Sequence, residues 1–316
     1  MEKINNILRL IRWSNLLFLG ALIYLMEKWV VVPILDKAAF GEQLPWYLLL
    51  LIGFGTILIA AGGYVINDYF DIKIDRINRP EQLIITQYIS KPAAMRLSIS
   101  LSGVGAACGL ASAWILHSGT IAILFIIIPG LLWFYSSSYK RLLIIGNIII
   151  ALLAGVTPMV VAIANIARLQ GLYSSILPYT TLVHDIYIWC GGFALFAFLL
   201  TWIREIIKDL QDQMGDRELE CHTMPIVWGE RSTKIFVTAL IALTTGLIIW
   251  LWYSVLPFEH SWQSFSTRYI FLGILTPLLG ALWLLWAAKI PSDYRTCQQV
   301  VKLTMLLGML YSICLT

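Results

Sequence analysis

Two short acidic segments follow directly on long apolar runs in this chain of 316 residues. The first, residues 67–75, holds one asparagine and three aspartates. The second, residues 209–216, holds three more aspartates. Carboxylates beside a strongly apolar stretch are costly unless they are paired or bind cations. Both segments are therefore candidates for a site that holds divalent metal and, through the metal, a diphosphate.

The spacing of these aspartates predicts that each set lies on one face of a helix. If the helix of the preceding apolar run continues, positions i, i+3 and i+7 fall on the same side. These positions are Asp68, Asp71 and Asp75 in the first set and Asp209, Asp212 and Asp216 in the second. Asn67 lies one turn before Asp71, as Glu205 lies one turn before Asp209.

Carboxylates gathered in this way repel one another unless cations neutralise them. Oxygen ligands select Mg²⁺ or a similar ion, which typically bridges protein carboxylates to the phosphate oxygens of a substrate. Two sets indicate two or more Mg²⁺ ions that share one diphosphate. The nearby side chains suited to neutralising phosphate oxygens are Arg76, Arg79, Lys140, Arg141, Arg204, Lys208 and Arg217.

Composition places the chain in a membrane, since 59% of the residues are hydrophobic and only 13% are charged. A spanning helix needs about 20 mainly apolar residues. The candidate spans are 14–35, 46–66, 94–116, 119–138, 142–165, 186–207, 234–256, 268–288 and 298–316. We therefore expect an all-α, polytopic membrane protein with nine transmembrane helices around a central cavity. Residues 1–316 contain no linker-like segment, which predicts a single membrane-embedded domain.

The distribution of basic residues predicts which side of the membrane the acidic segments face. With nine spans, 18 of the 22 Lys and Arg fall on the side of the N-terminus. The other side has only Lys28, Lys37, Arg168 and Arg268. Cytoplasmic loops are the ones enriched in Lys and Arg. We expect the N-terminus and both acidic segments to face the cytoplasm, in the cell (inner) membrane, with membrane lipids but no nucleic acid among the partners.

A simpler interpretation is that the aspartates lie in solvated loops and pair only with neighbouring Lys and Arg. The repetition of one helical spacing in two segments on one side of the membrane favours the metal site. An ion-coupled transporter also holds intramembrane carboxylates, but those usually lie near the midplane. Both sets here follow the ends of spans, which favours an enzyme.

The sequence resembles the UbiA-type intramembrane prenyltransferases over roughly residues 10–310. Residues 67–75 (NDYFDIKID) are similar to the first Asp-rich motif of that family, and residues 209–216 (DLQDQMGD) to the second. Residues 135–147 (YSSSYKRLLIIGN) resemble a third marker between spans. Residues 204–225 resemble the branch that includes digeranylgeranylglyceryl phosphate synthases.

The resemblance implies a set of functional residues. The metal ligands are Asn67, Asp68, Asp71, Asp75, Asp209, Asp212 and Asp216, of which the six aspartates, together with Lys140, are also the catalytic residues. The substrate-binding residues are Asn67, Arg76, Arg79, Tyr135, Tyr139, Arg141, Arg204 and Lys208. Together they bind an isoprenyl diphosphate and stabilise the leaving diphosphate. The allylic cation forms where water is excluded, near aromatic rings that can shield it.

The identity of the acceptor is the open point of this interpretation. A lipophilic prenylglyceryl phosphate, with geranylgeranyl diphosphate as donor, is the first expectation. The alternatives are an aromatic acceptor of quinone biosynthesis and a terpene cyclase of the same fold. Residues 81–88 (EQLIITQY) lack the basic residue and the glycine turn that family members often have after the first motif. This run borders the expected acceptor site.

Overall fold

The computed structural model describes residues 2–41, 43–255 and 261–315, and these residues divide into two compact units. The first unit contains residues 1–140 and 156–192 of the chain, and the second contains residues 141–155 and 193–316. Two helices, α7 (Ile145–Tyr173) and α8 (Leu182–Glu218), each contribute residues to both units. The expectation of a single domain over 1–316 stays a prediction.

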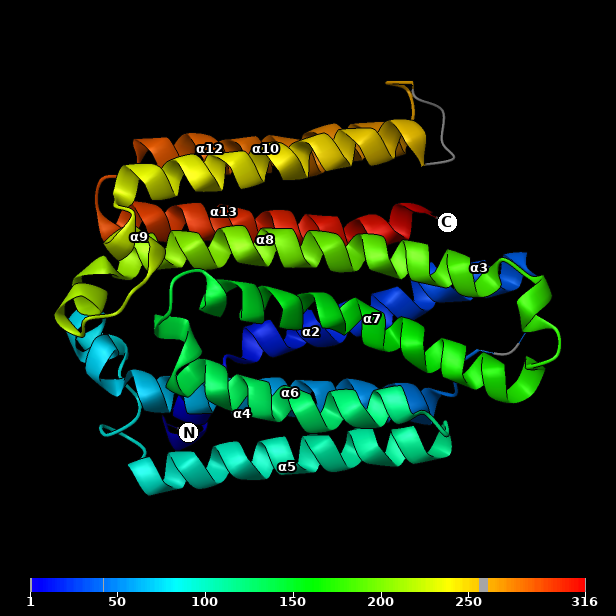
Figure 1. Ribbon diagram of the computed structural model, residues 1–316, viewed down its shortest axis with the longest axis horizontal. Helices are drawn as coiled ribbons and strands as arrows, with labels where there is room; N and C mark the ends of the chain where they lie inside the picture. The colour runs from blue at the N-terminus through cyan, green and yellow to red at the C-terminus, as the bar shows by residue number, and fades with distance from the viewer. Residues whose placement is uncertain (1, 42, 256–260, 316) are drawn as a thin grey trace. The chain divides into compact units, whose positions relative to one another are not determined.

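The first unit is built from helices joined by short turns (Figure 1). Besides its parts of α7 and α8, its elements are α1 (Glu2–Leu10), α2 (Trp13–Met26), the π-helical η1 (Glu27–Val31), α3 (Val32–Lys37), α4 (Trp46–Asn78), η2 (Pro80–Gln82), α5 (Lys91–Ile115), α6 (Gly119–Ser137), η3 (Tyr139–Arg141) and η4 (Leu177–Tyr179). A boundary between the units falls within η3, after Lys140. The chain reverses direction at His117, whose φ of 48° lies in the left-handed region.

Small residues allow α4 and α5 to pack closely along their length. A Cβ atom added at Gly105 of α5 would lie 2.7 Å from the carbonyl oxygen of Gly55 in α4. Further along, the Ser98 hydroxyl donates a 2.9 Å hydrogen bond to the carbonyl oxygen of Gly62. Such close approach of backbones is typical of helix pairs in membranes, where packing replaces the hydrophobic effect. It fixes α4, the helix that carries the first acidic segment.

A carboxyl group is buried inside the first span. Glu27 is only 1% exposed and lies in the π-helical turn η1 between α2 and α3. Its Oε2 atom accepts a 2.6 Å hydrogen bond from the Nδ2 atom of Asn165, which lies 138 residues later in α7. Its Oε1 atom has no hydrogen-bond partner within the described part of the chain. A charged or polar residue in this position needs its partner, because the membrane interior offers no water.

The connection between α4 and α5 is more apolar and more ordered than a solvated loop. Leu83, Ile84 and Ile85 are buried and pack in a cluster with Leu10 of α1. Thr86 has a φ of 85°. Its backbone amide donates a 2.8 Å hydrogen bond to the carbonyl oxygen of Ile89 and closes the turn. The unusual run after the first motif therefore places a buried, apolar turn at the end of α4 instead of a polar one.

The second unit forms a separate hydrophobic core. Besides its parts of α7 and α8, it contains α9 (Met224–Val227), α10 (Glu230–Ser254), α11 (Phe265–Arg268), the π-helical η5 (Tyr269–Leu275), α12 (Thr276–Ala287), α13 (Pro291–Leu310) and η6 (Tyr311–Leu315). Buried side chains such as Ile203, Val237, Leu278 and Val301 bring α8, α10, α12 and α13 together. Figure 1 shows α10 and α12 side by side, as their contacts require.

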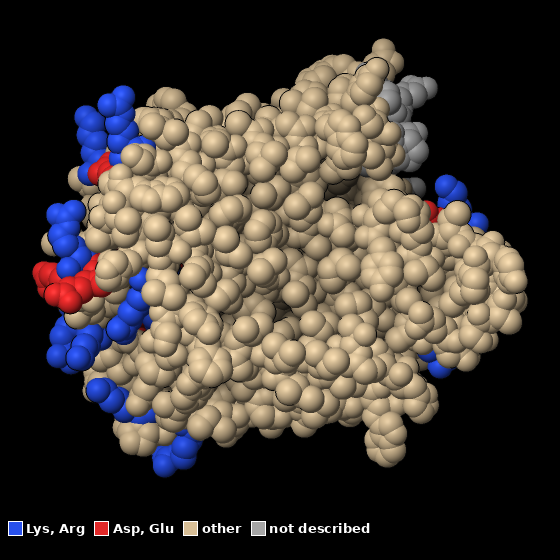
Figure 2. Space-filling model, in the orientation of Figure 1, with Lys and Arg blue, Asp and Glu red and all other residues tan. Residues whose placement is uncertain are grey.

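The prediction of an all-α, multi-pass fold is confirmed. Within the described ranges, nine helices are long and apolar enough to cross a membrane, and each coincides with an expected span. No strand occurs in those ranges, where Ile85 and Ile89 form an isolated bridge pair. On the face shown in Figure 2, charged side chains gather near the ends of the helices, and the surface between those ends shows no charged side chains. A central cavity stays a prediction.

Candidate active site

The helix of the first acidic segment continues unbroken to its end. Helix α4 runs for 33 residues, through the apolar span and on to Asn78. A helix of this length is about 50 Å long at 1.5 Å per residue, more than the ~30 Å hydrocarbon core of a bilayer. Asp68, Asp71 and Asp75 therefore lie on one face of the polar end of a single helix, as their spacing predicts.

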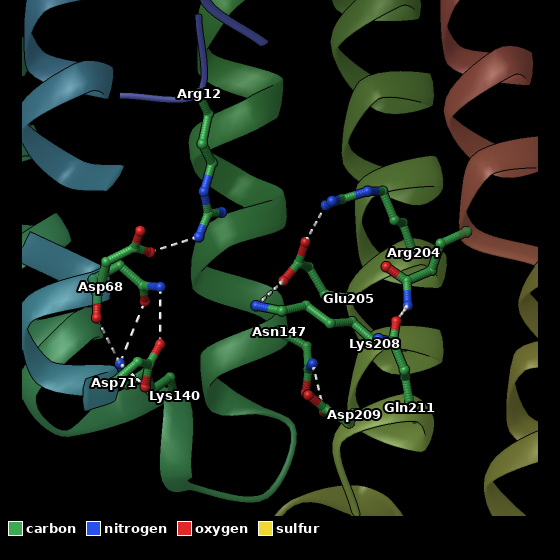
Figure 3. Close-up of polar contacts among 12 residues, drawn as sticks. Arg12, Asp68, Asp71, Lys140, Asn147, Arg204, Glu205, Lys208, Asp209 and Gln211 are labelled. Atoms are coloured by element: carbon green, nitrogen blue, oxygen red, sulfur yellow. Dashed lines mark hydrogen bonds and ion pairs between the residues drawn. The ribbon is translucent and has the colours of Figure 1, made fainter. Parts of the chain in front are cut away.

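Asp71 is the centre of a hydrogen-bonded group in the first unit (Figure 3). The amide of Asn67 donates to its Oδ2 atom at 2.9 Å. Its Oδ1 atom lies 2.6 Å from the Nζ atom of Lys140, which enters from η3. The same ammonium group lies 3.3 Å from the Asn67 Oδ1 atom. Lys140 is thus brought to the first acidic segment across 73 residues of sequence.

Asp68 has a different basic partner. The guanidinium of Arg12 lies 2.7 Å from its Oδ1 atom and stacks 4.9 Å above the centre of the Tyr64 ring. Arg12 has a φ of 54° at the turn between α1 and α2, so the turn itself directs this side chain. Sequence reasoning did not include Arg12 among the site residues, since nothing in its local sequence marks it.

The remaining residues expected in the first unit lie at the ends of α4 and α6 and in η3. Arg76 is exposed on the last turn of α4, and the Arg79 amide closes that helix by donating to the carbonyl of Asp75 at 2.8 Å. Tyr135 is buried in the last turn of α6. The ring of Tyr139, in η3, lies 6.3 Å from that of Phe134. Direct contact of either tyrosine with a substrate stays a prediction.

The second acidic segment is also fully helical. Helix α8 runs for 37 residues and ends at Glu218, so Asp209, Asp212 and Asp216 share one face of its final turns. The amide of Asn147, in α7, donates a 2.9 Å hydrogen bond to the Oδ2 atom of Asp209 (Figure 3). The hydroxyl of Thr223 donates to the Oδ2 atom of Asp216 at 2.9 Å.

Basic side chains accompany this segment in the second unit. Arg204 forms an ion pair with Glu205, and the Nζ atom of Lys208 lies 4.0 Å from the other oxygen of the same carboxylate. The backbone carbonyl of Arg141 accepts a 2.9 Å hydrogen bond from the amide of His222, just beyond the second segment. Arg141, Arg204 and Lys208 therefore lie in the same unit as the second acidic segment, where their role as substrate ligands remains a prediction.

Sequence reasoning left Asn147 and Glu205 out of the expected site, although signals for both were present. Asn147 stands in the third marker segment, residues 135–147, and Glu205 lies one turn before Asp209. The spacing along α8 already relates Glu205 to Asp209, whereas the contact of Asn147 with Asp209 depends on the packing of α7 against α8.

The donor atoms fit a hard divalent cation. Asn67 and the aspartates offer only oxygen ligands, and the described carboxylates now bind amide, hydroxyl, ammonium or guanidinium groups. No three His, Cys, Asp or Glu side chains are arranged to hold a metal ion in the part of the chain that the structure describes. Because oxygen-only sites select Mg²⁺ over softer metals, the chemistry of the set agrees with the expected ion.

Comparison with known proteins decides the family. Residues 37–309 match the UbiA prenyltransferase family. The chain belongs to this family. A curated relative from Thermococcus kodakarensis, a digeranylgeranylglyceryl phosphate synthase, is 33% identical over 68% of this chain and 69% of its own length. A protein of the same name from Methanosphaera stadtmanae is 30% identical over 78% of this chain and 79% of its own.

Solved structures of UbiA proteins share the fold. A structure described as that of a digeranylgeranylglyceryl phosphate synthase in membranes has a TM-score of 0.62 and 25% identity, covering 99% of this chain and 100% of its own. A UbiA homologue from Archaeoglobus fulgidus, bound to GPP and Mg²⁺, has a TM-score of 0.58 and 15% identity over 98% of this chain and 99% of its own. This UbiA chain is therefore a multi-pass membrane prenyltransferase.

Proposed function

We propose that this UbiA protein transfers a geranylgeranyl group from its diphosphate to the hydroxyl of a prenylglyceryl phosphate and so forms an ether lipid. The observation that carries the proposal is the group at Asp71, where a carboxylate, an amide and an ammonium meet within hydrogen-bond distance. Its support is the shared name of the relatives, digeranylgeranylglyceryl phosphate synthase. The 25% identity to a solved structure of that description supports the same function.

The donor diphosphate is bound through both acidic segments, which act on one substrate within one domain. Two or more Mg²⁺ ions would be held by Asn67 and by the six aspartates of the two segments, which are Asp68, Asp71, Asp75, Asp209, Asp212 and Asp216. When bound, Mg²⁺ supplies positive charge to the phosphate oxygens that leave. The relative bound to GPP and Mg²⁺ supports this assignment of donor and metal.

The protein's own cations complete the neutralisation of the diphosphate. Lys140 already lies at the first segment, where its ammonium group pairs with Asp71. Its three N–H donors can bind a phosphate oxygen in place of that carboxylate. Arg76, Arg79 and Arg141 add charge around both segments, and Arg204 and Lys208 are substrate-binding cations held at Glu205. Hydrogen bonds and charges that are aimed at the leaving group in advance lower the barrier to its departure. Aromatic rings, with Tyr135 and Tyr139 among them, shield the allylic cation from water.

The test is a transfer assay with purified protein. Geranylgeranyl diphosphate and geranylgeranylglyceryl phosphate are incubated with Mg²⁺ or with EDTA, and products are identified by mass spectrometry. We expect the diether phosphate only with Mg²⁺. Transfer to an aromatic ring instead, or cyclisation of the donor without any acceptor, would assign the chain to a different activity of the same family. Undiminished turnover in EDTA would remove the metal from the mechanism.

Two substitutions connect this activity to the acidic segments. Asp71→Asn and Asp212→Asn each remove one carboxylate at nearly constant volume, and we expect about 10²-fold or greater loss of turnover because charge stabilisation of the leaving group is lost. Asp36→Asn, at an exposed position in α3, is the matched control. Full activity of either site variant would refute the assignment of its segment.

A further inference from the structure

Glu205 is a buried carboxylate for which neither metal binding nor diphosphate binding gives a role. It is 7% exposed and lies in α8, one helical turn before Asp209 and hence further into the span. The set of proposed metal ligands on α8, Asp209, Asp212 and Asp216, is complete without it. An ionisable residue at such depth is costly, so it is expected to have a function.

Two cations flank this carboxylate. Arg204 pairs with the Oε1 atom of Glu205, and Lys208 approaches the Oε2 atom at 4.0 Å. Figure 3 shows the three side chains pointing to the same side of α8. One carboxylate between a guanidinium and an ammonium is suited to a ligand that has both a hydroxyl and a nearby phosphate, because the carboxylate accepts the hydroxyl proton and the cations bind the phosphate.

A second, independent observation comes from Thr201, one turn further into α8. Thr201 is 7% exposed, and its buried Oγ1 atom has no hydrogen-bond partner among the residues that the structure describes. At 100° per residue, Thr201, Glu205 and Asp209 share one face of the helix within roughly 80°. Leaving a buried hydroxyl without a hydrogen bond is unfavourable, and a polar group of a ligand would supply the missing bond.

We propose that Glu205 is the catalytic base that takes the proton from the acceptor's hydroxyl, and that Arg204, Lys208 and Thr201 bind the acceptor beside it. This proposal rests on the proposed function and names the part of the site that receives the phosphate-bearing alcohol. The acceptor oxygen forms a bond to C1 of the isoprenyl group. The bond from C1 to the diphosphate breaks, and its electron pair leaves with the diphosphate. The hydroxyl proton moves to Glu205 and then to water.

The base needs only modest strength. Once the acceptor oxygen bonds to the allylic carbon, it carries positive charge and its remaining proton is strongly acidic. An ordinary carboxylate is then sufficient to remove it. Without this base, the attack reverses and the donor is re-formed, so loss of Glu205 prevents transfer but leaves the cleavage of the donor intact.

The experiment separates donor cleavage from transfer. Donor labelled with ¹⁸O in the bridging position is incubated with Mg²⁺, and movement of the label to a non-bridging position reports reversible cleavage. We expect Glu205→Gln to keep this exchange and the donor affinity within about twofold, while kcat for transfer falls by about 10²–10⁴, the usual contribution of a general base. Glu218→Gln, exposed at the end of the same helix, is the control and should match the wild type.

Each of the following outcomes overturns the proposal or the function on which it rests. If Glu205→Gln keeps its transfer rate, or if only KM for the acceptor rises, Glu205 serves merely to hold Arg204 and Lys208. If exchange and transfer are lost together, it belongs to the donor site. Thr201→Val provides a test that does not depend on the stability of the first variant, since transfer should slow about tenfold with exchange unchanged, and an unaffected rate counts against the acceptor site. Should the wild type transfer to no phosphate-bearing alcohol at all, the proposed function itself fails.

Discussion

Each acidic segment contains an aspartate that is held by an asparagine amide at the same distance. Asn67 binds Asp71 and Asn147 binds Asp209, both at 2.9 Å. In the first segment the two residues are one helical turn apart, whereas in the second they come from different helices. The amide orients one carboxylate oxygen, and in Asp71 the other oxygen faces the ammonium group of Lys140. Preorganisation of this kind is what a metal or phosphate site requires.

The basic partner of Asp71 gives a prediction about metal binding. Lys140 occupies an Asp71 oxygen at 2.6 Å and so competes with any cation for that oxygen. Lys140→Met should therefore tighten Mn²⁺ binding in the absence of donor by about fivefold, equivalent to ~1 kcal/mol, and weaken donor binding by about tenfold. Titration calorimetry measures both affinities.

The control for this experiment is Lys73→Met, which removes an exposed cation from the same end of α4. It should change neither affinity by more than about twofold, since exposed charges at a distance are screened. Weaker metal binding in Lys140→Met would contradict the competition and show that Lys140 instead holds Asp71 in its binding orientation.

At the scale of single residues, the sequence predicted the aspartates but not what binds them. Their helical spacing was visible because the residues are close in the chain. Arg12 and Asp68 are 56 residues apart, and Asn147 and Asp209 are 62 apart. Pairs at such separations depend on how helices pack, and a single sequence carries no local signal for them.

Among the elements, α4 and α5 form a pair whose separation is set by glycine. The carbonyl oxygen of Gly55 leaves no room for a Cβ atom at Gly105, since the two atoms would lie 2.7 Å apart. Because backbone rather than a flexible side chain stands in the way, the helices must move apart to accommodate a methyl group. That movement would shift the face on which the first acidic segment lies.

We expect Gly105→Ala to destabilise the protein by about 1–3 kcal/mol, the usual cost of overpacking. Thermal unfolding in detergent measures the effect as a lower Tm. Gly103→Ala, two residues away on the same helix with open space around its Cβ position, should leave Tm unchanged or slightly higher. Equal Tm values for the two variants would show that α4 and α5 are not held at this contact.

The positions of the helices were largely predictable, and their ends were not. Apolar runs of about 20 residues located all nine spans. The extension of α4 and α8 beyond the membrane was expected only from the spacing of the aspartates. The run from Leu83 to Ile85 is buried against Leu10, and nothing in the sequence indicated this contact. Its three consecutive apolar residues had no periodicity to indicate a partner.

For the molecule as a whole, the chain divides in a way that composition cannot show. Residues 156–192 join the unit of residues 1–140, and residues 141–155 join the other unit. Two of the three boundaries, after residues 155 and 192, fall inside continuous helices, α7 and α8, where no change in hydropathy marks them. Sequence reasoning could therefore expect two halves with an acidic segment each, but not the interleaving of their segments.

The sidedness of the whole molecule is testable by labelling. If the acidic segments face the cytoplasm, a cysteine replacing the exposed Lys73 reacts with a membrane-impermeant maleimide only after cells are permeabilised. A cysteine replacing the exposed Lys37 reacts in intact cells. The unsubstituted protein gives the background from its five native cysteines. The reverse pattern would invert the topology.

The buried pair of Glu27 and Asn165 has a consequence for biosynthesis. The two residues are 138 positions apart, and translation adds about 5–20 residues per second. The carboxyl group of the first span must therefore wait roughly 7–28 seconds in the translocating machinery or the bilayer before its amide partner is made. During that interval the buried carboxyl group lacks the amide that binds it in the folded chain. A chain truncated before Asn165 should therefore hold its first span less stably in the membrane than the full chain does.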